Sequence, residues 1–356
     1  MARIMAWGCA IVVIAASVAA FISERLDTLN FFDDVQASFS DACTPVRGAI
    51  APGVIHIDRL TRRAFIGALE QGKSRRGVIY SASLDDPLDA AGWQDQTGGA
   101  PVRFSPRAID LFRSRDAAAR ADEPTGGVLF VANIAAKTID AFTVNGASAL
   151  EYRESYVERR LTAPVGVAAV GGNAFYAVVD PGAANGAWSH NIVAPRSTGF
   201  VLHFNGVAWR EAARGLKRPS GIALSEDGAQ VFVAEAGLRA IRIFDRSLET
   251  GNLTLQSVVD LDAEPFSIKR AGADEFWIAA WPKPLAVSAL EGDRADVAPS
   301  AIYVLKLNTE GVFEATPVLA DTGAALSGAT ATARLGDRLL IGAPFADKYL
   351  TCRVPT

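Results

Sequence analysis

A strand–turn–strand pattern recurs along this chain, and its clearest copy is Arg218–Asp245, RPSGIALSEDGAQVFVAEAGLRAIRIFD. The apolar run Gly221–Leu224 leads into Asp227-Gly228, a dipeptide that suits the positive φ angles of a tight hairpin turn. The next run, Val231–Ala234, is apolar on both faces, which is typical of a strand packed between two sheets. A third run, Ala240–Phe244, ends the copy and leaves no room in it for a helix.

Further copies of the pattern lie on both sides of this one, at Gly127–Asn133, Gly166–Val179, Phe266–Ala280 and Ala331–Gly342. The segment Gly53–Leu69, continued by Gly77–Ser81, reads as a first unit. The copies are roughly fifty to sixty residues apart, a spacing typical of sheet repeats arranged radially around an axis. The sequence therefore predicts an all-β fold, a six-bladed β-propeller; the alternative is a pair of β-sandwiches.

The composition fits one large domain that is rich in turns. The chain has 356 residues, of which 50% are hydrophobic, with 31 Gly, 17 Pro and a formal net charge of −4. This length supports a sizeable core, and a propeller uses it as a single domain. Because the charge is close to neutral and no basic stripe is interleaved with aromatic residues, we expect no nucleic-acid partner.

An uncharged apolar stretch, Ile4–Ile22, follows Arg3 near the N-terminus. As a helix it would span roughly 28 Å, about the thickness of a bilayer core. A cleaved signal peptide usually has a shorter apolar centre, although the small residues Ala16–Ala20 offer a cleavage site. The sequence favours a signal anchor or transmembrane helix over residues 1–22, which makes the membrane a partner. A connector over 23–42 and a propeller over 43–356 then lie on the extracytoplasmic or luminal side.

Two of the three cysteines lie at the ends of the predicted propeller. Cys43 and Cys352 bracket it, whereas Cys9 lies in the apolar stretch. A ring of blades must bring its first and last strands together, so a Cys43–Cys352 disulfide would fasten the closure across a loop of about 300 residues. The alternative is two free buried thiols, but the predicted extracytoplasmic location favours the disulfide.

Two insertions interrupt the repeat, at Pro181–Ser197 and Pro282–Pro299. Long loops on the rim of a propeller often form the lid of a central site. The first insertion contains Trp188 and His190, and His190 has the strongest claim to a functional role among the three histidines. The other two histidines lie in apolar strand segments, which favours structural roles.

Familiar catalytic motifs are absent from the sequence, which has no Gly-rich phosphate loop, no Cys-x-x-Cys pair and no nucleophile elbow. Three histidines make a His-built metal site improbable, and no His or acid is placed beside Ser220 for a triad. The active positions of a propeller normally lie at its axis, where the innermost strands begin. The axial candidates are therefore the residues just before each inner repeat: Val54, Arg107, Val165, Ser220 and Phe266.

Short motifs in a fixed order carry a family resemblance. They are Glu24-Arg25-Leu26, Asp41–Gly48, Ala64-Phe65-Ile66, Phe104-Ser105-Pro106, Asn133 with Ala136-Lys137-Thr138, Ala174-Phe175-Tyr176, Gly221-Ile222, Asp227-Gly228, Ala234-Glu235, and Leu339–Gly342 with Phe345 and Cys352. From about residue 20 to residue 354 the chain resembles the paraoxonase/arylesterase family of six-bladed propellers, which is more distantly similar to gluconolactonases and strictosidine synthases. The resemblance implies calcium-dependent hydrolysis of lactones and aryl esters, with an axial calcium ion polarising the carbonyl and a histidine network activating water.

The sequence departs from the family at the positions that carry this chemistry. The family's acidic and amide ligands are replaced here by Val54-Ile55, Val165-Gly166, Ser220 and Pro265-Phe266, and its pocket histidines by Arg107, Ile134 and Trp281. Asp180 is the nearby acid that does match. Calcium takes roughly six to eight oxygen ligands, which these apolar side chains do not supply. We therefore expect no calcium and no other metal cofactor in the pocket.

Two functional classes stay open. The first is a membrane-anchored propeller that binds or hydrolyses a small ester, lactone or anionic compound without calcium. The second is a non-catalytic binding or scaffold propeller. Both take a small-molecule ligand in an axial pocket, whose candidate residues are Val54, Arg107, Asn133, Val165, Asp180, Ser220, Phe266, Trp281 and Phe345.

Overall fold

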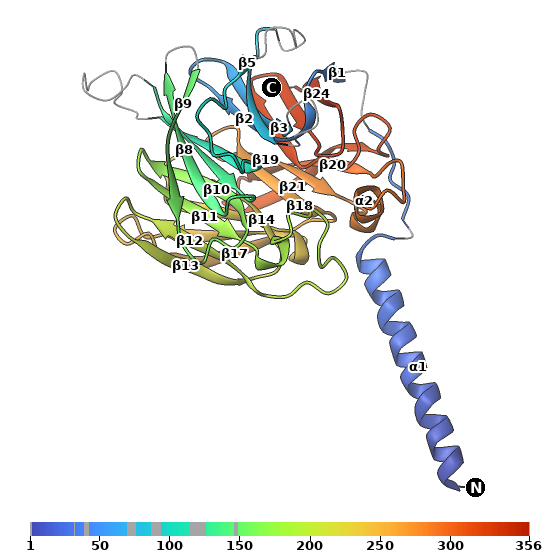
Figure 1. The fold of residues 1–356 in the computed structure, drawn as a ribbon. Helices are drawn as coiled ribbons and strands as arrows, with labels where there is room; N and C mark the ends of the chain where they lie inside the picture. The colour runs from blue at the N-terminus through green and yellow to red at the C-terminus, as the bar shows by residue number, and fades with distance from the viewer. Residues whose placement is uncertain are drawn as a thin grey trace.

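The structure is a computed structural model that describes residues 2–31, 33–38, 43–69, 76–86, 94–113, 126–145 and 149–355, with the backbone alone at 2–12, 69 and 94. In this part of the chain the strands form six antiparallel sheets of four strands each. They are gathered into one body from which a single helix projects (Figure 1). The sheets follow one another along the chain, and only the last combines strands from both ends.

The first three sheets are built from consecutive strands. The first contains β2 (Ile50–Asp58), β3 (Arg63–Leu69), β4 (Gly77–Ser83) and β5 (Gln94–Asp95). The second contains β6 (Pro106–Phe112), β7 (Val128–Asn133), β8 (Thr138–Asn145) and β9 (Ala149–Val157). The third contains β10 (Pro164–Gly171), β11 (Ala174–Val179), β12 (Gly199–Phe204) and β13 (Trp209–Leu216).

The remaining sheets complete the set. The fourth contains β14 (Pro219–Leu224), β15 (Gln230–Glu235), β16 (Ala240–Arg246) and β17 (Leu253–Asp260). The fifth contains β18 (Glu264–Arg270), β19 (Glu275–Trp281), β20 (Ser300–Leu307) and β21 (Phe313–Asp321). The sixth contains β22 (Ala331–Leu335), β23 (Arg338–Gly342), β24 (Lys348–Arg353) and, as its outermost strand, β1 (Cys43–Arg47).

The innermost strands form a closed ring. They contact one another in the order β2, β6, β10, β14, β18 and β22, and β22 contacts β2 again. The predicted six-bladed propeller is therefore confirmed, and the β-sandwich alternative is wrong. β1 pairs with β24 with Cys43 opposite Cys352, and these two residues form the predicted disulfide across a sequence separation of 309. For so long a loop the chain-entropy model predicts a stabilisation of about 5–6 kcal/mol, and disulfides typically contribute about 2–4 kcal/mol.

The core lies between neighbouring sheets, because each sheet packs on both faces. β7 is buried along its whole length, and β15 is buried from Val231 onward. The rings of Phe232 and Phe276, from adjacent blades, lie 4.1 Å apart. The predicted turn at Asp227-Gly228 also forms, with Gly228 at a φ of 72° and the Ala229 backbone N–H donating to Asp227. Packing on both faces explains why the central strands lack alternating polar residues.

The helix α1 (Ala2–Thr28) precedes the propeller and extends away from it (Figure 1). It continues past the predicted boundary at residue 22. At its C-terminal end Arg25 donates to the carbonyl oxygens of Ile192 and Val193, at 3.1 and 2.8 Å. Across the described residues, we find no helix with the length and apolarity that crossing a membrane requires. Residues 39–42 of the predicted connector lie outside the described residues.

Both predicted insertions lie at the end of the propeller where the innermost strands begin, because antiparallel strands place the β11–β12 and β19–β20 connections there. The first insertion starts with the 3₁₀ turn η2 (Pro181–Ala183). The second forms the helix α2 (Pro284–Glu291), which the sequence did not predict. Pro284 stands at its first turn, where a residue without an N–H is tolerated.

Candidate functional site

Four of the innermost strands have a proline as their first or second residue, and a bulged residue follows it. The register of each shifts across one residue, between Pro106 and Ala108, Pro164 and Gly166, Pro219 and Gly221, and Pro265 and Ser267. Proline suits the start of a strand because it has no backbone donor for the ladder. A bulge re-aims the side chain of the extra residue. The extra residues here are Arg107, Val165, Ser220 and Phe266.

These four residues line one pocket at the axis, together with Val54 of β2. The cavity inside it has a volume of about 40 Å³ and continues into space that is open to solvent. The charged side chains in its wall are Arg107, Arg218 and Lys269, and none of the described residues that line it is an Asp or Glu. The wall is therefore cationic.

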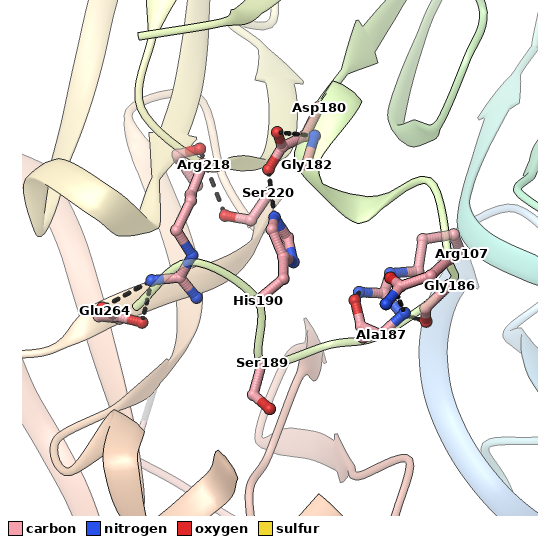
Figure 2. A network of polar contacts seen from close by, with 12 residues as sticks. Arg107, Asp180, Gly182, Gly186, Ala187, Ser189, His190, Arg218, Ser220 and Glu264 are labelled. Carbon is pink, nitrogen blue, oxygen red and sulfur yellow. Dashed lines mark hydrogen bonds and ion pairs between the residues drawn. The ribbon is translucent and has the colours of Figure 1, made fainter. Parts of the chain in front are cut away.

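Arg107 lies beneath the first insertion. Its guanidinium is 3.2 Å from the centre of the Trp188 ring. It also donates to the carbonyl oxygens of Gly186 and Ala187, at 3.3 and 3.1 Å (Figure 2). No carboxylate of the described residues lies within ion-pair distance of it. Burial lowers the pKa of Arg107 to about 9.

The two insertions hold each other over the pocket. Glu291, the last residue of α2, accepts hydrogen bonds from the backbone N–H groups of Trp188 and Ser189, at 2.8 and 2.9 Å. The Trp188 ring lies 6.5 Å from that of Phe266, which belongs to the pocket wall. The geometry is that of a lid, since a segment of one insertion covers the axis and a carboxylate of the other fastens it.

His190 and Asp180 form a pair beside the lid. Asp180 caps η2 by accepting from the Gly182 backbone N–H at 3.0 Å, and its other carboxylate oxygen lies 2.6 Å from His190 Nε2. His190 Nδ1 is buried and has no hydrogen-bond partner among the described residues. Figure 2 shows Nδ1 on the far side of the ring from Asp180. When Nε2–H donates to Asp180, Nδ1 keeps a free lone pair and can accept a proton.

Ser220 does not complete a triad with this pair. Its hydroxyl donates to the carbonyl oxygen of Pro265 at 2.6 Å. In Figure 2 the nitrogen of His190 that carries the hydrogen-bond line is directed at Asp180. The geometry therefore supports activation of water by His190, not of the Ser220 hydroxyl.

Arg218 contributes the second guanidinium of the pocket. Its Nη1 donates to both carboxylate oxygens of Glu264, at 2.7 and 2.8 Å, and both side chains are almost fully buried. Burial raises the pKa of Glu264, although the positive charge of Arg218 opposes the rise. Arg218 has a φ of 48°, in the left-handed region, immediately before β14.

Farther along the same innermost strands, His56, Asp110 and Lys269 form a second charged cluster. Asp110 Oδ1 lies 3.2 Å from His56 Nδ1 and 3.9 Å from Lys269 Nζ, and Oδ2 accepts from the Ala169 backbone N–H at 2.8 Å. Lys269 also donates to the carbonyl oxygen of Ile109 at 2.5 Å. Burial lowers the pKa values of His56 and Lys269. Burial alone would raise the pKa of Asp110, but its contacts with the other two hold it below its ordinary value.

Three of the predicted site residues support the pocket without lining it. Asn133 is fully buried and bridges Arg103 and Asp140 through its side-chain amide. Trp281 donates to the carbonyl oxygen of Ala329 and stacks on Phe266, with ring centres 3.5 Å apart. Phe345 packs against the apolar cluster that contains Phe266 and Trp281. Asp180 lies behind His190, and the other five predicted residues face the pocket.

The donor set of the pocket does not fit the calcium ion that the family resemblance implies. Val54, Val165 and Phe266 present only carbon atoms, and the Ser220 hydroxyl is bonded to a backbone carbonyl. Within the described residues, no group of three His, Cys, Asp or Glu side chains is placed to hold a metal ion. Calcium requires several oxygen ligands, and the positive charges of Arg107 and Lys269 oppose its entry.

Sequence reasoning missed the residues that make pairs across the pocket. Arg218 and Glu264 were not among the predicted site residues, although each immediately precedes a proline near the start of an inner repeat, Pro219 and Pro265. Glu291 carried no recognisable pattern. The pairing of Asp180 with His190 had one available clue, because Asp-Pro at the end of a strand often caps a turn that brings the following loop back.

The fold defines a class, the six-bladed propellers, and this one has a pocket at its axis. The arylesterase family model matches residues 67–354, so the chain belongs to the arylesterase family. No curated protein sequence matches the chain at a significant level.

Solved structures of two enzyme-like propellers are similar in fold. A luciferin-regenerating enzyme superposes with a TM-score of 0.56 at 12% identity, covering 88% of this chain and 96% of that one. A structural-genomics protein provisionally described as a gluconolactonase gives 0.55 at 11% identity, covering 91% and 95%. At such identities the likeness shows the fold alone.

Proposed function

We propose that this propeller hydrolyses small esters or lactones in the axial pocket, with water activated by His190 and Asp180. The observation that carries the proposal is the buried Nδ1 of His190, which has no partner among the described residues while Asp180 holds the opposite nitrogen. Membership of the arylesterase family supports the same chemistry. An Asp-oriented imidazole is a recurring general base in acyl transfer.

The steps require only this pair and a water molecule. His190 Nδ1 accepts a proton as the water oxygen bonds to the carbonyl carbon, and Asp180 stabilises the resulting imidazolium. The same proton then passes to the alkoxide or phenolate oxygen as the carbon–oxygen bond of the ester breaks. A carboxylic acid and an alcohol, or a hydroxy acid from a lactone, leave the pocket.

The cationic wall supplies the electrostatic part of the proposal. Negative charge develops on the carbonyl oxygen in the transition state, and fixed positive groups in a water-poor site stabilise it. Arg107 and Arg218 both line the pocket and are both buried. Closure of Trp188 over Arg107 excludes bulk water and strengthens these interactions.

The test is an assay of the full chain with phenyl acetate and with small lactones. Replacing His190 by Ala should lower kcat by about 10²–10⁴-fold, the usual contribution of a general base. His203→Gln is the matched control, because His203 is buried outside the pocket. Equal losses in both variants, or none in His190→Ala, would refute the role of His190. Absence of hydrolysis in the wild-type chain would favour the non-catalytic binding propeller.

We also propose that the propeller acts outside the cytoplasm and that α1 attaches it to a membrane. The Cys43–Cys352 disulfide supports the oxidising compartment, and the uncharged stretch Ile4–Ile22 supports attachment. Fractionation of cells that produce the full chain tests this directly. Recovery of an intact chain in the soluble fraction would contradict attachment by α1.

A further inference from the structure

Arg218 leaves half of its guanidinium unused. Nη1 donates hydrogen bonds to Glu264, whereas Nε and Nη2 are buried and have no hydrogen-bond partner among the described residues. Nε and Nη2 form one edge of the guanidinium, and this edge binds a carboxylate through two parallel hydrogen bonds. Buried donors without partners are costly, so such an edge in a pocket wall calls for an acceptor.

The placement of this edge is fixed by its surroundings. The Arg218 side chain is 3% exposed and lines the axial pocket. Figure 2 shows the nitrogen atoms that do not contact Glu264 turned towards the side of His190. Its φ of 48° is unfavourable for a side chain other than glycine or asparagine, and such outliers are retained where the surrounding structure holds them for a purpose.

The charges around the pocket favour an anion. Arg107, Arg218 and Lys269 line it, and the described residues of the wall include no carboxylate. Asp110 lies close to Lys269, and Glu264 is held by Nη1 of Arg218, so each of these acids sits behind a cation that faces the pocket. Arg107 is already bonded to two lid carbonyls and stacked on Trp188. Arg218 is therefore the guanidinium with free donors.

We infer that the substrate carries a carboxylate in addition to its ester or lactone group, and that the Nε and Nη2 edge of Arg218 binds this carboxylate. The inference rests on the proposed function, since it names the substrate class of the same pocket. It makes Arg218 a specificity-determining residue that selects anionic substrates, while His190 remains the group that acts on water.

A matched pair of substrates tests the inference. The full chain is assayed with 3- and 4-acetoxybenzoate and with 3- and 4-acetoxybenzamide, which are neutral and nearly the same size. Each kcat/KM is divided by the rate of hydrolysis by hydroxide, to remove differences in leaving group. We expect the carboxylates to be favoured about tenfold or more, as for a charge-assisted bidentate contact.

Two variants locate the effect. Arg218→Lys keeps a cation beside Glu264 but removes the two-nitrogen edge, so the preference for the carboxylate should fall about tenfold. Arg242→Lys is the control, because Arg242 pairs with Glu235 at 2.6 Å in the same blade and does not line the pocket. It should leave the preference as it is in the wild-type chain.

A binding measurement separates this inference from the proposed function. Calorimetric titration of the full chain with benzoate and with benzamide should show that benzoate binds about tenfold or more tightly than benzamide. This difference should be lost in Arg218→Lys. Hydrolysis of all four esters without a preference for the carboxylates overturns the inference and leaves the proposed function standing. Selective binding of benzoate without hydrolysis of any ester would support the carboxylate site and refute the proposed hydrolysis. If Arg218→Lys does not fold, the wild-type comparison of benzoate with benzamide decides.

Discussion

Two groups of charged side chains lie along the axial pocket, Arg218 with His190 at its mouth and Asp110 with Lys269 farther along the innermost strands, and their partners differ. At the mouth, Arg218 and His190 keep buried nitrogen atoms that have no partners among the described residues. Farther along, Lys269 lies 3.9 Å from Asp110 and balances its charge, and Asp110 also contacts the Ala169 backbone N–H and His56 Nδ1, which lies 3.2 Å away without a hydrogen bond of good geometry. The free donors at the mouth point to a ligand, whereas Asp110 has its counter-charge within the fold.

This difference indicates which charges serve function and which serve stability. A buried donor without an acceptor lowers stability, whereas a paired buried charge becomes destabilising only when one partner is removed. Substitutions of His190, and Arg218→Lys, which keeps a cation beside Glu264, should therefore change binding and catalysis more than folding. Substitutions in the cluster around Asp110 should do the opposite.

The largest expected effect on the free energy of unfolding is at the charged cluster of His56, Asp110 and Lys269. Lys269→Met removes the cation beside Asp110 and leaves a buried carboxylate short of a partner, so the free energy of unfolding should fall by about 2–3 kcal/mol. Urea denaturation of the full chain measures it. Removing both charges, in Asp110→Asn with Lys269→Met, should recover most of the loss. A double variant as unstable as the single one would contradict the pairing.

The next effect comes from a histidine outside the pocket and sets the baseline for any pH profile. His203 stacks on Tyr176, and burial together with Arg246 and Arg210 lowers its pKa to about 4. As the pH falls, His203 is therefore protonated near pH 6.5 in the unfolded chain but only near pH 4 in the folded chain. The contribution of His203 to the free energy of unfolding is fully present above the pKa of the unfolded chain, and it is lost as the pH falls through this range.

The size of this loss can be measured. Between about pH 7.5 and pH 5 the wild-type chain should lose about 2 kcal/mol from His203, and His203→Gln should lose less. Urea denaturation at both values is the measurement. Loss of activity at a pH where the fold is intact can then be assigned to the mouth of the pocket. Equal pH dependence in both chains would show that His203 is not the source.

A smaller effect is expected when the same kind of substitution is made at the mouth. Arg107→Met removes a buried cation whose partners are the Trp188 ring and two neutral carbonyls in a half-buried loop; the Met side chain can still pack on the ring, and water can replace the guanidinium at the carbonyls. Its free energy of unfolding should change by about 1 kcal/mol or less, because the relief of charge burial offsets the lost hydrogen bonds. A loss as large as that in Lys269→Met would remove the distinction between the two groups.

The smallest effect is expected from calcium. Because the pocket presents carbon atoms and cations where oxygen ligands would be needed, neither calcium nor a chelator should shift the melting temperature by more than about 1 °C. Scanning calorimetry of the full chain with EDTA and with millimolar calcium checks this. A clear rise in the melting temperature with calcium would show that an ion binds to the folded chain. It would contradict the conclusion that the pocket does not fit calcium.

The fold was predictable because its evidence is local. Each blade repeats apolar runs separated by turns such as Asp227-Gly228, and a strand buried on both faces can be recognised from its own residues. Closure through Cys43 and Cys352 followed from the need of a ring to join its ends. The length of α1 and the helix in the second insertion were harder, since element boundaries and short helices depend on tertiary contacts.

The site was predictable in position but not in composition. Sequence placed Arg107, Val165, Ser220 and Phe266 at the axis because each opens an inner repeat. It did not bring together Arg218 and Glu264, which are 46 residues apart in different blades, or Asp110 and Lys269. Such pairs depend on the register and on the rotation between blades, and neither is encoded in a short stretch of sequence.

The bulges at the start of four of the six inner strands have a consequence for which side chains the axis can carry. The extra residue stands outside the ladder, so its side chain can be exchanged without breaking a backbone hydrogen bond of the sheet. Charged, hydroxyl, aliphatic and aromatic side chains occupy equivalent places here, in Arg107, Ser220, Val165 and Phe266. The side chains at these positions can therefore be exchanged while the sheets are kept, so the chemistry of the axis is separable from the stability of the scaffold.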